Sequence, residues 1–500
     1  MKKLLLTIIL IGNSIHSQST PFYKGGDISI LDQIEDNGGT YTENGEVINV
    51  LDIFKNHDIN LIRLKLWHTP DSDYNSLPNV LEMASRIIEA DMKFLLDIHY
   101  SDFWADPGHQ TTPTAWENLS FEILSDSVYH YTKSVLESFR EQNLLPHIVQ
   151  IGNEIDNGFL WPEGSVSHWG QFTDLLNAGI LGVNDALADG DTVKIMIHIA
   201  KGGDNNGSVW FFDNLENYNV DFDLIGQSFY PWWHGTFDNL EYNLNDLAER
   251  YDKEIMVVET AYPWTLNWND NTHNIVGSEQ LLDGYPASVN GQKQFLLYLL
   301  NIVENIPNDL GKGFCYWSPE WISTETFGSP WENLSLFDFE GEVLETIQIF
   351  ETVDTTITLY HQNGWNLVGL PLMVTQIEWE FVFPDAVEGT LFSFDGVYME
   401  EIHFQNGNGY WLRFNDAGGT TIAGTSINEL TISLNGGWNL ISGISIPLDV
   451  TEIQDPDGII IAGTVYGFAF GGYSNEEILE PGKGYWIRAN SSGSIILIDN

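Results

Sequence analysis

The chain has 500 residues and a mass of 56.5 kDa, and at roughly 100 to 200 residues per domain this length excludes a single small domain. Hydrophobic residues make up 43% of the sequence and charged residues 18%, which excludes global disorder. The 71 Asp and Glu residues outnumber the 19 Lys and Arg residues, for a formal charge of −52. Because such a field repels phosphate backbones and anionic surfaces, nucleic acids and polyanionic substrates are unfavourable partners.

The first residues are typical of a secretory signal peptide. Lys2 and Lys3 precede an apolar stretch from Leu4 to about Ile11, and small or polar residues follow it. This stretch is too short to span a bilayer and no later segment qualifies, so we expect no membrane span. We expect removal of residues 1–17 and a protein that is secreted, periplasmic or held at the cell surface.

Eight short apolar runs alternate with amphipathic stretches between residues 22 and 353. They are nearly continuous in Ile, Leu, Val and Phe, as strands buried on both faces are, and they cover Phe22–Asp27, Leu61–Trp67, Phe94–His99, Ile148–Asn153, Val193–Ile199, Leu224–Tyr230, Ile255–Glu259 and Gly313–Trp317. The stretches between them have helical spacing. The pattern predicts an α/β fold, a (β/α)8 TIM barrel over residues 18–354. An open doubly wound sheet is the alternative, but no Gly-rich phosphate motif follows the first run.

The single cysteine, Cys315, lies in the last apolar run. No neighbouring feature suggests activation of a thiolate, so we expect a buried core thiol and not a nucleophile.

Residues 355–500 have a different texture, with short alternating segments and frequent Gly and Asn. The sequence NGWNL at 363–367 recurs as GGWNL at 436–440, and GYWLR at 409–413 recurs as GYWIR at 484–488. This repetition predicts two all-β repeats, 355–430 and 431–500. Their paired tryptophans are either the core of each small module or platforms that stack on carbohydrate, and we favour the core: Trp365 with Trp438, and Trp411 with Trp486.

Two glutamates directly follow buried runs. Glu154 ends the fourth and Glu259 the seventh, and in a barrel the active site lies at the carboxyl ends of the strands. The two side chains can therefore face each other across a cleft, as glycoside hydrolysis requires. Either one alone could be an ordinary strand-end carboxylate paired with Arg or Lys, but the two together favour a catalytic pair.

Other polar and aromatic residues are concentrated at the same strand ends. Aromatic rings can stack on the apolar faces of sugars while polar groups take the hydroxyls, although any single tryptophan could equally belong to the core. The candidate substrate-binding residues are Asp27, Arg63, His99, Trp104, Asn153, Trp161, Tyr230, Trp232 and Trp317.

Four segments of the chain resemble the family 53 endo-β-1,4-galactanases: FYKGGD at 22–27, IRLKLW at 62–67, LDIHYSDFWADPG at 96–108 and QIGNEIDNGFLWP at 150–162. The resemblance covers roughly residues 22 to 350. It implies a retaining mechanism with Glu154 as acid/base and Glu259 as nucleophile. Retention in turn requires carboxyl groups about 5 to 5.5 Å apart.

Supporting roles follow from charge and position within this resemblance. We expect Arg63 to keep Glu259 ionised, and a drier environment to keep the proton on Glu154. The remaining expectations are that Asn153 bonds the sugar 2-hydroxyl, Tyr230 steadies the nucleophile, and His99 and Trp317 shape the subsite of the cleaved sugar.

The resemblance also implies a possible structural calcium that ties two loops together. The candidate ligands are Asn269, Asn271, His273, Ser335 and Asp338. Calcium prefers six to eight oxygen ligands, and this set has few carboxylates, so a polar, hydrogen-bonded loop is the alternative. No cofactor is expected to be required for the chemistry.

The first functional hypothesis is a secreted, monomeric, retaining endo-glycosidase that hydrolyses neutral β-1,4-galactan, the arabinogalactan type I of pectin side chains. A second is another retaining β-glycanase of the same barrel type, a mannanase or a β-glucanase, because fold and carboxylates do not specify the sugar. A third is a non-catalytic surface protein that only binds glycans, and the presence of both glutamates argues against it.

Overall fold

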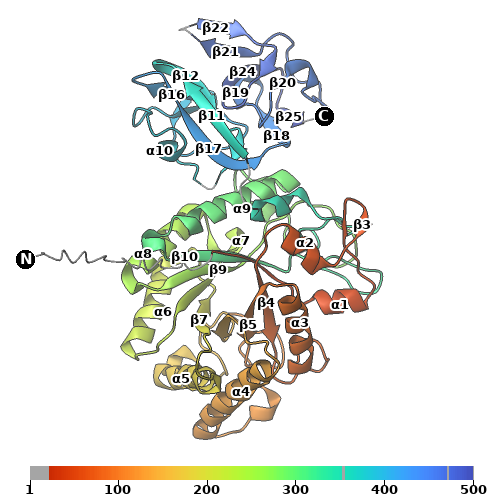
Figure 1. The fold of residues 1–500 in the computed structure, drawn as a ribbon, viewed down its shortest axis with the longest axis vertical. Helices are drawn as coiled ribbons and strands as arrows, with labels where there is room; N and C mark the ends of the chain where they lie inside the picture. Colours follow the sequence, from red (N-terminus) through yellow and green to blue (C-terminus); the bar gives the residue numbers. More distant parts are fainter. Residues whose placement is uncertain (1–21, 352–354, 375, 470–471, 499–500) are drawn as a thin grey trace, which may run out of the picture.

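The computed structural model describes residues 22–351, 355–374, 376–469 and 472–498. Its first part is a closed barrel in which every neighbouring pair of strands is parallel (Figure 1). The strands are β1 (Tyr23–Asp27), β4 (Leu61–Leu66), β5 (Lys93–Ile98), β6 (Ile148–Ile151), β7 (Lys194–Ile199), β8 (Leu224–Ser228), β9 (Glu254–Thr260) and β10 (Gly311–Trp317). They match the eight apolar runs, so the predicted TIM barrel is confirmed.

Helices surround the barrel and cross over between consecutive strands. The main ones are α2 (Val50–Asn56), α3 (Leu77–Glu89), α4 (Phe121–Glu141), α5 (Trp169–Ala186), α6 (Asn205–Asn217), α8 (Phe237–Tyr251) and α9 (Val289–Glu304), with short turns of helix at α1 (Leu31–Asp36) and α7 (Pro231–His234). In α3 the buried residues Val80, Met83 and Ile87 recur at helical spacing and form one apolar stripe. Side-chain caps define several starts, such as Ser120, which accepts a hydrogen bond from the Ile123 N–H.

The interior of the barrel is built in layers because alternate residues of each strand point inward. The lower layer is apolar and consists of Tyr23, Leu61, Leu95, Ile148, Met196, Leu224, Met256, Val258 and Cys315. Two residues further along four neighbouring strands stand Arg63, Asp97, Gln150 and His198, all buried. The barrel therefore has an apolar floor and a polar mouth.

Cys315 belongs to that apolar floor, as predicted. Burial raises the pKa of its thiol to about 12. A Cβ atom at Gly25 on the adjacent strand would lie 2.5 Å from the sulfur, so only glycine leaves it room. The thiol is a packing group.

The remaining residues form two antiparallel repeats, here called the tail. The first contains β11 (Thr355–His361), β12 (Gly364–Gly369), β13 (Leu372–Met373), α10 (Trp379–Val382), β14 (Phe392–Phe394), β15 (Tyr398–Glu400), β16 (Gly409–Phe414) and β17 (Gly418–Ser426). The second contains β18 (Glu429–Leu434), β19 (Gly437–Ser442), β20 (Leu448–Asp449), β21 (Tyr466–Ala469), β22 (Gly472–Asn475), β23 (Ile478–Leu479), β24 (Gly484–Ala489) and β25 (Gly493–Ile498).

Each repeat contains a four-stranded sheet of the same design. The order is β12-β16-β14-β15 in the first repeat and β19-β24-β21-β22 in the second. The boundary predicted between residues 430 and 431 falls inside β18, because this strand pairs along its length with β25 of its own repeat. The second repeat thus begins at Glu429.

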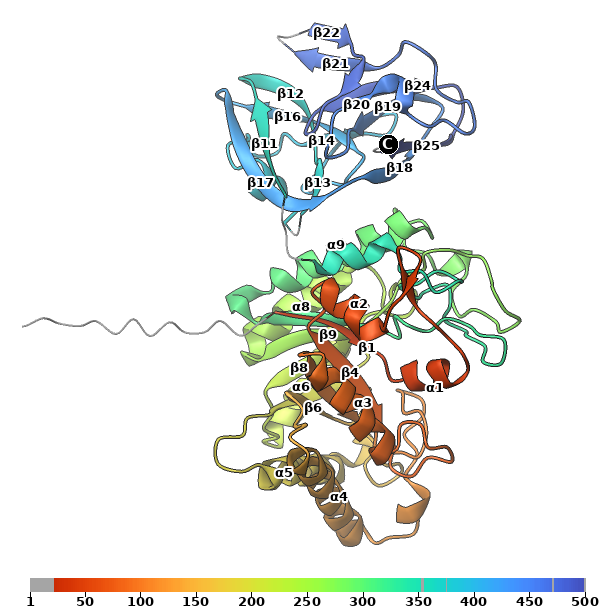
Figure 2. The same ribbon diagram turned by 45° about the vertical axis from the view of Figure 1, so that its right-hand side comes forward.

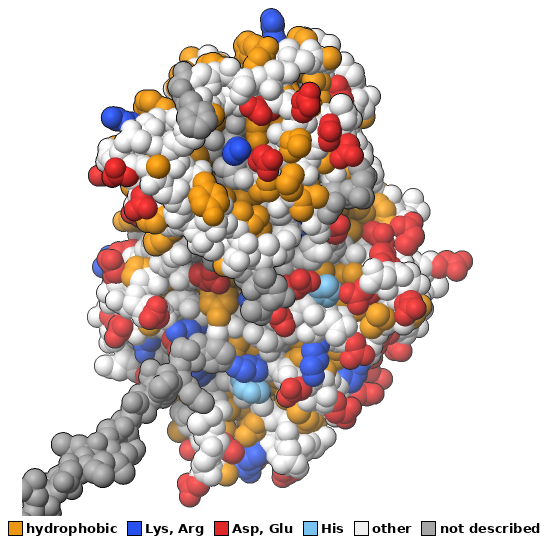
Figure 3. All heavy atoms as spheres, turned by 45° about the horizontal axis from the view of Figure 1, so that its top comes forward, with side chains coloured by type: hydrophobic (Ala, Val, Ile, Leu, Met, Phe, Trp, Pro, Cys, Tyr) orange, Lys and Arg blue, Asp and Glu red, His pale blue; other side chains and the backbone are white. Residues whose placement is uncertain are grey.

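The tail packs against the outer side of the barrel at α9, and both ribbon views place it there (Figures 1 and 2). Tyr298 of α9 lies with its ring centroid 5.9 Å from that of His403, and Gln376 Nε2 donates to Asn305 Oδ1 at 3.2 Å. Acidic side chains are scattered over the face shown in Figure 3, and hydrophobic side chains are exposed on the tail.

Among the described residues, no helix is both long and apolar enough to cross a membrane. The predicted signal peptide, residues 1–17, lies outside the described residues.

Candidate active site

A cleft of about 720 Å³ opens at the carboxyl ends of the barrel strands. Both predicted catalytic glutamates line it, together with seven of the nine predicted substrate-binding residues: Asp27, Arg63, His99, Trp104, Asn153, Tyr230 and Trp317. One carboxylate oxygen of Glu154 and one of Glu259 lie within 4.8 Å of each other. The strand ends therefore bring the two carboxyl groups together across a shared groove.

Glu154 follows the end of β6 on a sharply turning backbone. Its φ is 47°, after Gly152 at 82°, a left-handed conformation that is rare for a side chain with a Cβ and that clusters at functional sites. Gln110 Nε2 supports the turn by donating to the Glu154 carbonyl at 3.3 Å. The Ser228 hydroxyl donates to Glu154 Oε1 at 2.6 Å. Burial, and then the charge of Glu259, raise the pKa of Glu154 well above its usual range, so this carboxyl keeps its proton.

Glu259 lies in β9 and is held by two donors. Arg63 Nη1 donates to Glu259 Oε1 at 2.8 Å, and the Tyr230 hydroxyl donates to Oε2 at 3.2 Å. Burial raises the pKa of Glu259 to about 7, while Arg63 acts in the opposite direction. Since no cation bonds Glu154 in the described structure, Glu259 is the member of the pair that loses its proton first.

Arg63 is the centre of the polar mouth. Its guanidinium donates to the carboxylates of Asp27, Asp97 and Glu259 at 2.8, 2.9 and 2.8 Å. Burial alone would lower the pKa of Arg63, but these three carboxylates raise it above its usual value. Because one cation is shared among three anions, Asp27 and Asp97 also raise the pKa of Glu259. Arg63 therefore lowers the pKa of Glu259 as expected, but burial and the two neighbouring carboxylates raise that pKa by more.

Asn153 and His99 are fixed in place by the same network. Asn153 Oδ1 accepts from Arg63 Nη2 at 2.8 Å, and Nδ2 donates to the Ala105 carbonyl at 2.8 Å. The Ala105 N–H donates to His99 Nδ1 at 3.2 Å, which leaves His99 Nε2 as the protonated nitrogen that bonds Asp97 at 2.9 Å. Both side chains are oriented before any ligand arrives.

The cleft has aromatic walls, formed by Trp104, Trp233, Trp317, Trp321 and Trp331. The Trp317 ring lies 4.7 Å from that of Trp331 and 5.8 Å from that of Trp104. Lys65 Nζ sits 3.8 Å from the centre of the Trp104 ring, and burial lowers the pKa of this ammonium to about 8. A flat apolar ring with polar substituents fits such walls.

Two of the predicted substrate-binding residues lie outside the lining of this cleft. The Trp161 indole donates to the Asn157 carbonyl at 3.0 Å, and Trp232 packs on Tyr230 with ring centroids 5.4 Å apart. Successive residues of a helical turn point in different directions, so in α7 it is Trp233 that faces the cleft. Substrate contacts by Trp161 and Trp232 stay predictions.

Residues 23–350, the whole barrel, match the sequence profile of glycosyl hydrolase family 53. The chain belongs to this family. A protein of Niallia circulans called "uncharacterized protein in bgaB 5'region" is 47% identical over 340 residues, which are 65% of this chain and 92% of that protein. The arabinogalactan endo-β-1,4-galactanase of Cellvibrio japonicus is 37% identical and covers 68% of this chain and 93% of its own length.

A solved structure agrees with the family assignment. The family 53 catalytic domain of Ignisphaera aggregans superposes with a TM-score of 0.64 at 40% identity, covering 68% of this chain and 98% of that domain. Membership makes the barrel a glycoside hydrolase, and the match ends where the tail begins.

Sequence reasoning missed four buried polar residues of the family 53 site: Asp97, Gln150, His198 and Ser228. His198 Nε2 bonds the Ser228 hydroxyl at 2.9 Å, and that hydroxyl bonds Glu154. The alternation of side chains along a strand could have identified three of them. Asp97, Gln150 and His198 each stand two positions after a residue of the apolar floor and therefore face the barrel interior as well.

The predicted calcium ligands lie in the loops that follow β9 and β10: Asn269, Asn271, His273, Ser335 and Asp338. The loops touch, since Asn269 Nδ2 donates to the Phe339 carbonyl at 3.4 Å. The Ser335 hydroxyl is buried and donates to a backbone carbonyl at 2.7 Å, and Asp338 is the one carboxylate in the predicted set. These side chains do not by themselves supply the six to eight oxygens that calcium takes.

Proposed function

We propose that this protein is an exported endo-acting galactanase that hydrolyses neutral β-1,4-galactan with retention of anomeric configuration. The observation that carries the proposal is the separation within 4.8 Å of oxygens from Glu154 and Glu259. Retaining enzymes hold their carboxyl groups about 5 to 5.5 Å apart, whereas inverting enzymes leave about 6.5 to 9.5 Å for a water molecule. The galactanase named above supports the choice of substrate.

In the first step, the Glu259 carboxylate attacks the anomeric carbon and the bond to the leaving oxygen breaks. Glu154, whose pKa is raised by burial, donates its proton to that oxygen, so the departing chain leaves as an alcohol. In the second step, Glu154 takes a proton from water as the water attacks the same carbon. The ester to Glu259 breaks, and both carboxyl groups return to their starting states.

The neighbouring residues have positioning roles in this scheme. Arg63 and Tyr230 hold the two oxygens of Glu259 in one orientation. Ser228 orients Glu154. Asn153 uses one amide hydrogen on the Ala105 carbonyl, and we assign its second amide hydrogen to the 2-hydroxyl of the sugar being cleaved.

The aromatic walls favour a neutral sugar but do not by themselves separate galactan from mannan or β-glucan. The deciding experiment compares the release of reducing ends from linear β-1,4-galactan, mannan and cellulose, with NMR detection of the first anomer formed. We expect rapid cleavage of galactan with the β-anomer appearing first. Release from mannan or cellulose and not from galactan would support the second hypothesis, and tight binding to glycans without release would support the third.

The mechanism also requires that Glu259 be essential. The Glu259→Ala variant is expected to lose hydrolysis of galactan while keeping the fold, because Arg63 keeps Asp27 and Asp97 as buried partners. Unchanged release of reducing ends by this variant would disprove the assignment of the nucleophile.

We further propose that residues 1–17 direct export and that the mature protein is a monomer. N-terminal sequencing of protein from the culture medium tests the first statement, and a cut near residue 17 is the expected result. Light scattering at several protein concentrations tests the second.

A further inference from the structure

The tail carries two open grooves whose linings are entirely aromatic among the described residues. The first has a volume of about 420 Å³ and is lined by Trp365, Phe392, Tyr398, Trp411 and Phe468. The second has a volume of about 470 Å³ and is lined by Phe394, Tyr398, Trp438, Tyr466, Tyr473 and Trp486. Tyr398 belongs to both, so the grooves are contiguous.

The expectation that the paired tryptophans form the core of the tail is wrong for both members of the first pair, Trp365 and Trp438. Trp365 is 44% exposed and Trp438 is 42% exposed, while Trp486 is only 9% exposed. All four tryptophans line the grooves, Trp365 and Trp411 the first and Trp438 and Trp486 the second. Trp486 does belong to the tail core, in a buried cluster with Leu367 and Leu440 against which Trp411 packs.

The grooves are equivalent by the internal repeat. Phe392 stands opposite Trp411 in the first sheet, as Tyr466 stands opposite Trp486 in the second. Each groove also contains one ring from the other repeat. The ring centroid of Phe468, from the second repeat, lies 4.8 Å from that of Trp411 in the first. Likewise Phe394 of the first repeat lies 4.8 Å from Trp486 of the second. The same aromatic site is thus built twice on one side of the tail.

The groups beside the rings indicate a ligand with an apolar face and polar edges. Arg413 stands opposite Trp365 and Arg488 opposite Trp438 in the strand register. The Arg488 guanidinium lies 5.8 Å from the Trp438 ring centre. Residues 355–500 contain only three Lys or Arg residues, and two of them occupy these equivalent positions. They provide hydrogen-bond donors next to each stacking surface.

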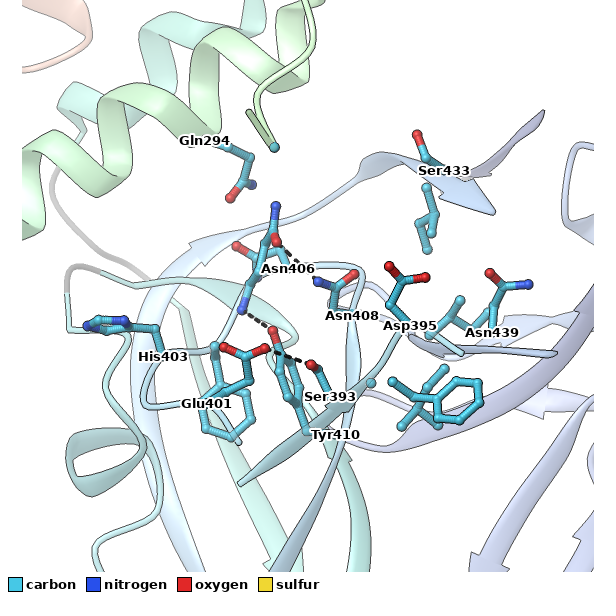
Figure 4. A pocket seen from close by; sticks show the side chains of 18 of the residues that line it. Gln294, Ser393, Asp395, Glu401, His403, Asn406, Asn408, Tyr410, Ser433 and Asn439 are labelled. Atoms are coloured by element: carbon cyan, nitrogen blue, oxygen red, sulfur yellow. Dashed lines mark hydrogen bonds between the residues drawn. The ribbon is translucent and has the colours of Figure 1, made fainter. Parts of the chain in front are cut away.

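A further cavity, of about 520 Å³, lies between α9 and the tail (Figure 4). Some of its polar side chains bond one another: Ser393 donates to Glu401 at 2.6 Å, and Asn408 Nδ2 donates to Gln405 Oε1 at 3.1 Å. Both bonds lie within the tail, whereas Gln294 Nε2 of α9, which also lines the cavity, is buried without a hydrogen-bond partner in the described structure. The described lining mixes polar, aliphatic and aromatic side chains, so the cavity lacks the all-aromatic surface of the two grooves.

We propose that the two aromatic grooves bind a neutral, β-linked polysaccharide chain of the class cleaved in the barrel. The identity of the sugar rests on the proposed function. Pyranose rings have apolar C–H faces and hydroxyl edges. The cleft in the barrel is lined by Trp104 and Trp317, whose rings can stack on such faces. The tail repeats that chemistry, and the described residues of both linings include no charged side chain. Two linked sites hold the enzyme on its substrate and raise the effective concentration of chain at the cleft.

The test uses the full-length chain with Trp365→Ala, Trp438→Ala and the double substitution. Tyr360→Ala is the matched control, because Tyr360 is 81% exposed on β11 and lines neither groove. Retention is measured as depletion from solution by insoluble β-1,4-galactan, in a Glu259→Ala background that prevents cleavage. The activity of each variant with Glu259 intact is measured on soluble galactan, and melting temperatures verify folding.

We expect the double variant to lose about ten-fold or more of its retention, each single variant to lose part of it, and Tyr360→Ala to lose none. Activity on soluble galactan should stay within about two-fold for all, since the cleft is untouched. Double-variant retention equal to that of Tyr360→Ala overturns the proposal and leaves the galactanase assignment standing.

Three other outcomes are decisive. Tryptophan-dependent retention on polygalacturonate in preference to galactan, or tryptophan-dependent capture of a polyproline peptide and not of glycans, overturns the assignment of a neutral polysaccharide. Failure to cleave galactan, with tryptophan-dependent retention on mannan or cellulose, refutes the proposed activity but supports the grooves.

Discussion

Arg63 is the residue whose removal tests the network most directly. The Arg63→Ala substitution leaves Asp27, Asp97 and Glu259 without the cation that now lies 2.8 to 2.9 Å from each. Removing one partner of a buried ion pair costs about 3 to 5 kcal/mol because the remaining charge is buried and unpaired. Unfolding entropy is roughly 2.1 cal/mol/K per residue. Over the barrel, residues 23–350, the melting temperature should fall by about 4 to 7 °C.

The same substitution should change the pH dependence of catalysis. Glu259 must be ionised to attack, so kcat/KM falls as the pH drops through its pKa of about 7. Without Arg63, which lowers that pKa, the acid limb should move to higher pH. Arg63→Lys is the matched control, because it restores a charge without the fork of five donors, and an intermediate shift is expected.

Differential scanning calorimetry measures the melting temperature. The second readout is the profile of kcat/KM on galactan between about pH 5 and 9, which extends roughly two pH units to either side of the pKa of Glu259. If Arg63→Ala melts with the wild type and keeps its acid limb in place, the guanidinium does not control Glu259 and the electrostatic argument is wrong. A lower melting temperature with an unmoved acid limb would mean that Arg63 stabilises the barrel without tuning the nucleophile.

Three further predictions concern individual groups. Glu154→Gln should lower kcat/KM, which reports the first step, by about 10²- to 10⁴-fold on galactan but much less on an aryl glycoside whose leaving group needs no proton; equal losses of kcat/KM on both substrates would contradict the acid role. Tyr230→Phe removes the hydrogen bond to Glu259 Oε2, worth about 1.5 to 3 kcal/mol to a charged acceptor, so kcat should fall by about 10- to 100-fold while KM stays near its wild-type value; a change confined to KM would place Tyr230 in substrate binding instead. EDTA should leave kcat unchanged, because two carboxylates carry the proposed chemistry; a fall in melting temperature alone would indicate a structural calcium between the loops of Asn269 and Asp338, and a fall in kcat would contradict the scheme.

The strand ends show why part of the site was predictable. Each buried strand is a continuous apolar run, so a glutamate such as Glu154 or Glu259 that directly follows one is conspicuous in the sequence. Residues inside the runs, such as Asp97 and His198, were not recognised. The local sequence does not show whether a single polar residue among apolar ones points into the barrel or away from it. The alternation of inward and outward residues supplies that direction once the strand register is known.

The tryptophans show the opposite case. Nothing in the local sequence distinguishes Trp232 from Trp233, yet only Trp233 lines the cleft. In the tail, identical placement in two repeats suggested a core role for Trp365 and Trp438, and both proved to be half-exposed. A repeated sequence pattern shows that a residue occupies the same place in both modules. That place can lie on the surface as well as in the packed core.

The sequence by itself determined the eight-stranded barrel, the division between barrel and tail, the two repeats and the two strand-end glutamates, because each depends on periodicity or on short segments contiguous in the chain. The tertiary structure alone decided the distance between Glu154 and Glu259, the sharing of Arg63 among three carboxylates, and the exposure of the tail rings. These properties depend on contacts between residues far apart in sequence, such as the 196 positions between Arg63 and Glu259, and burial and pKa follow from those contacts.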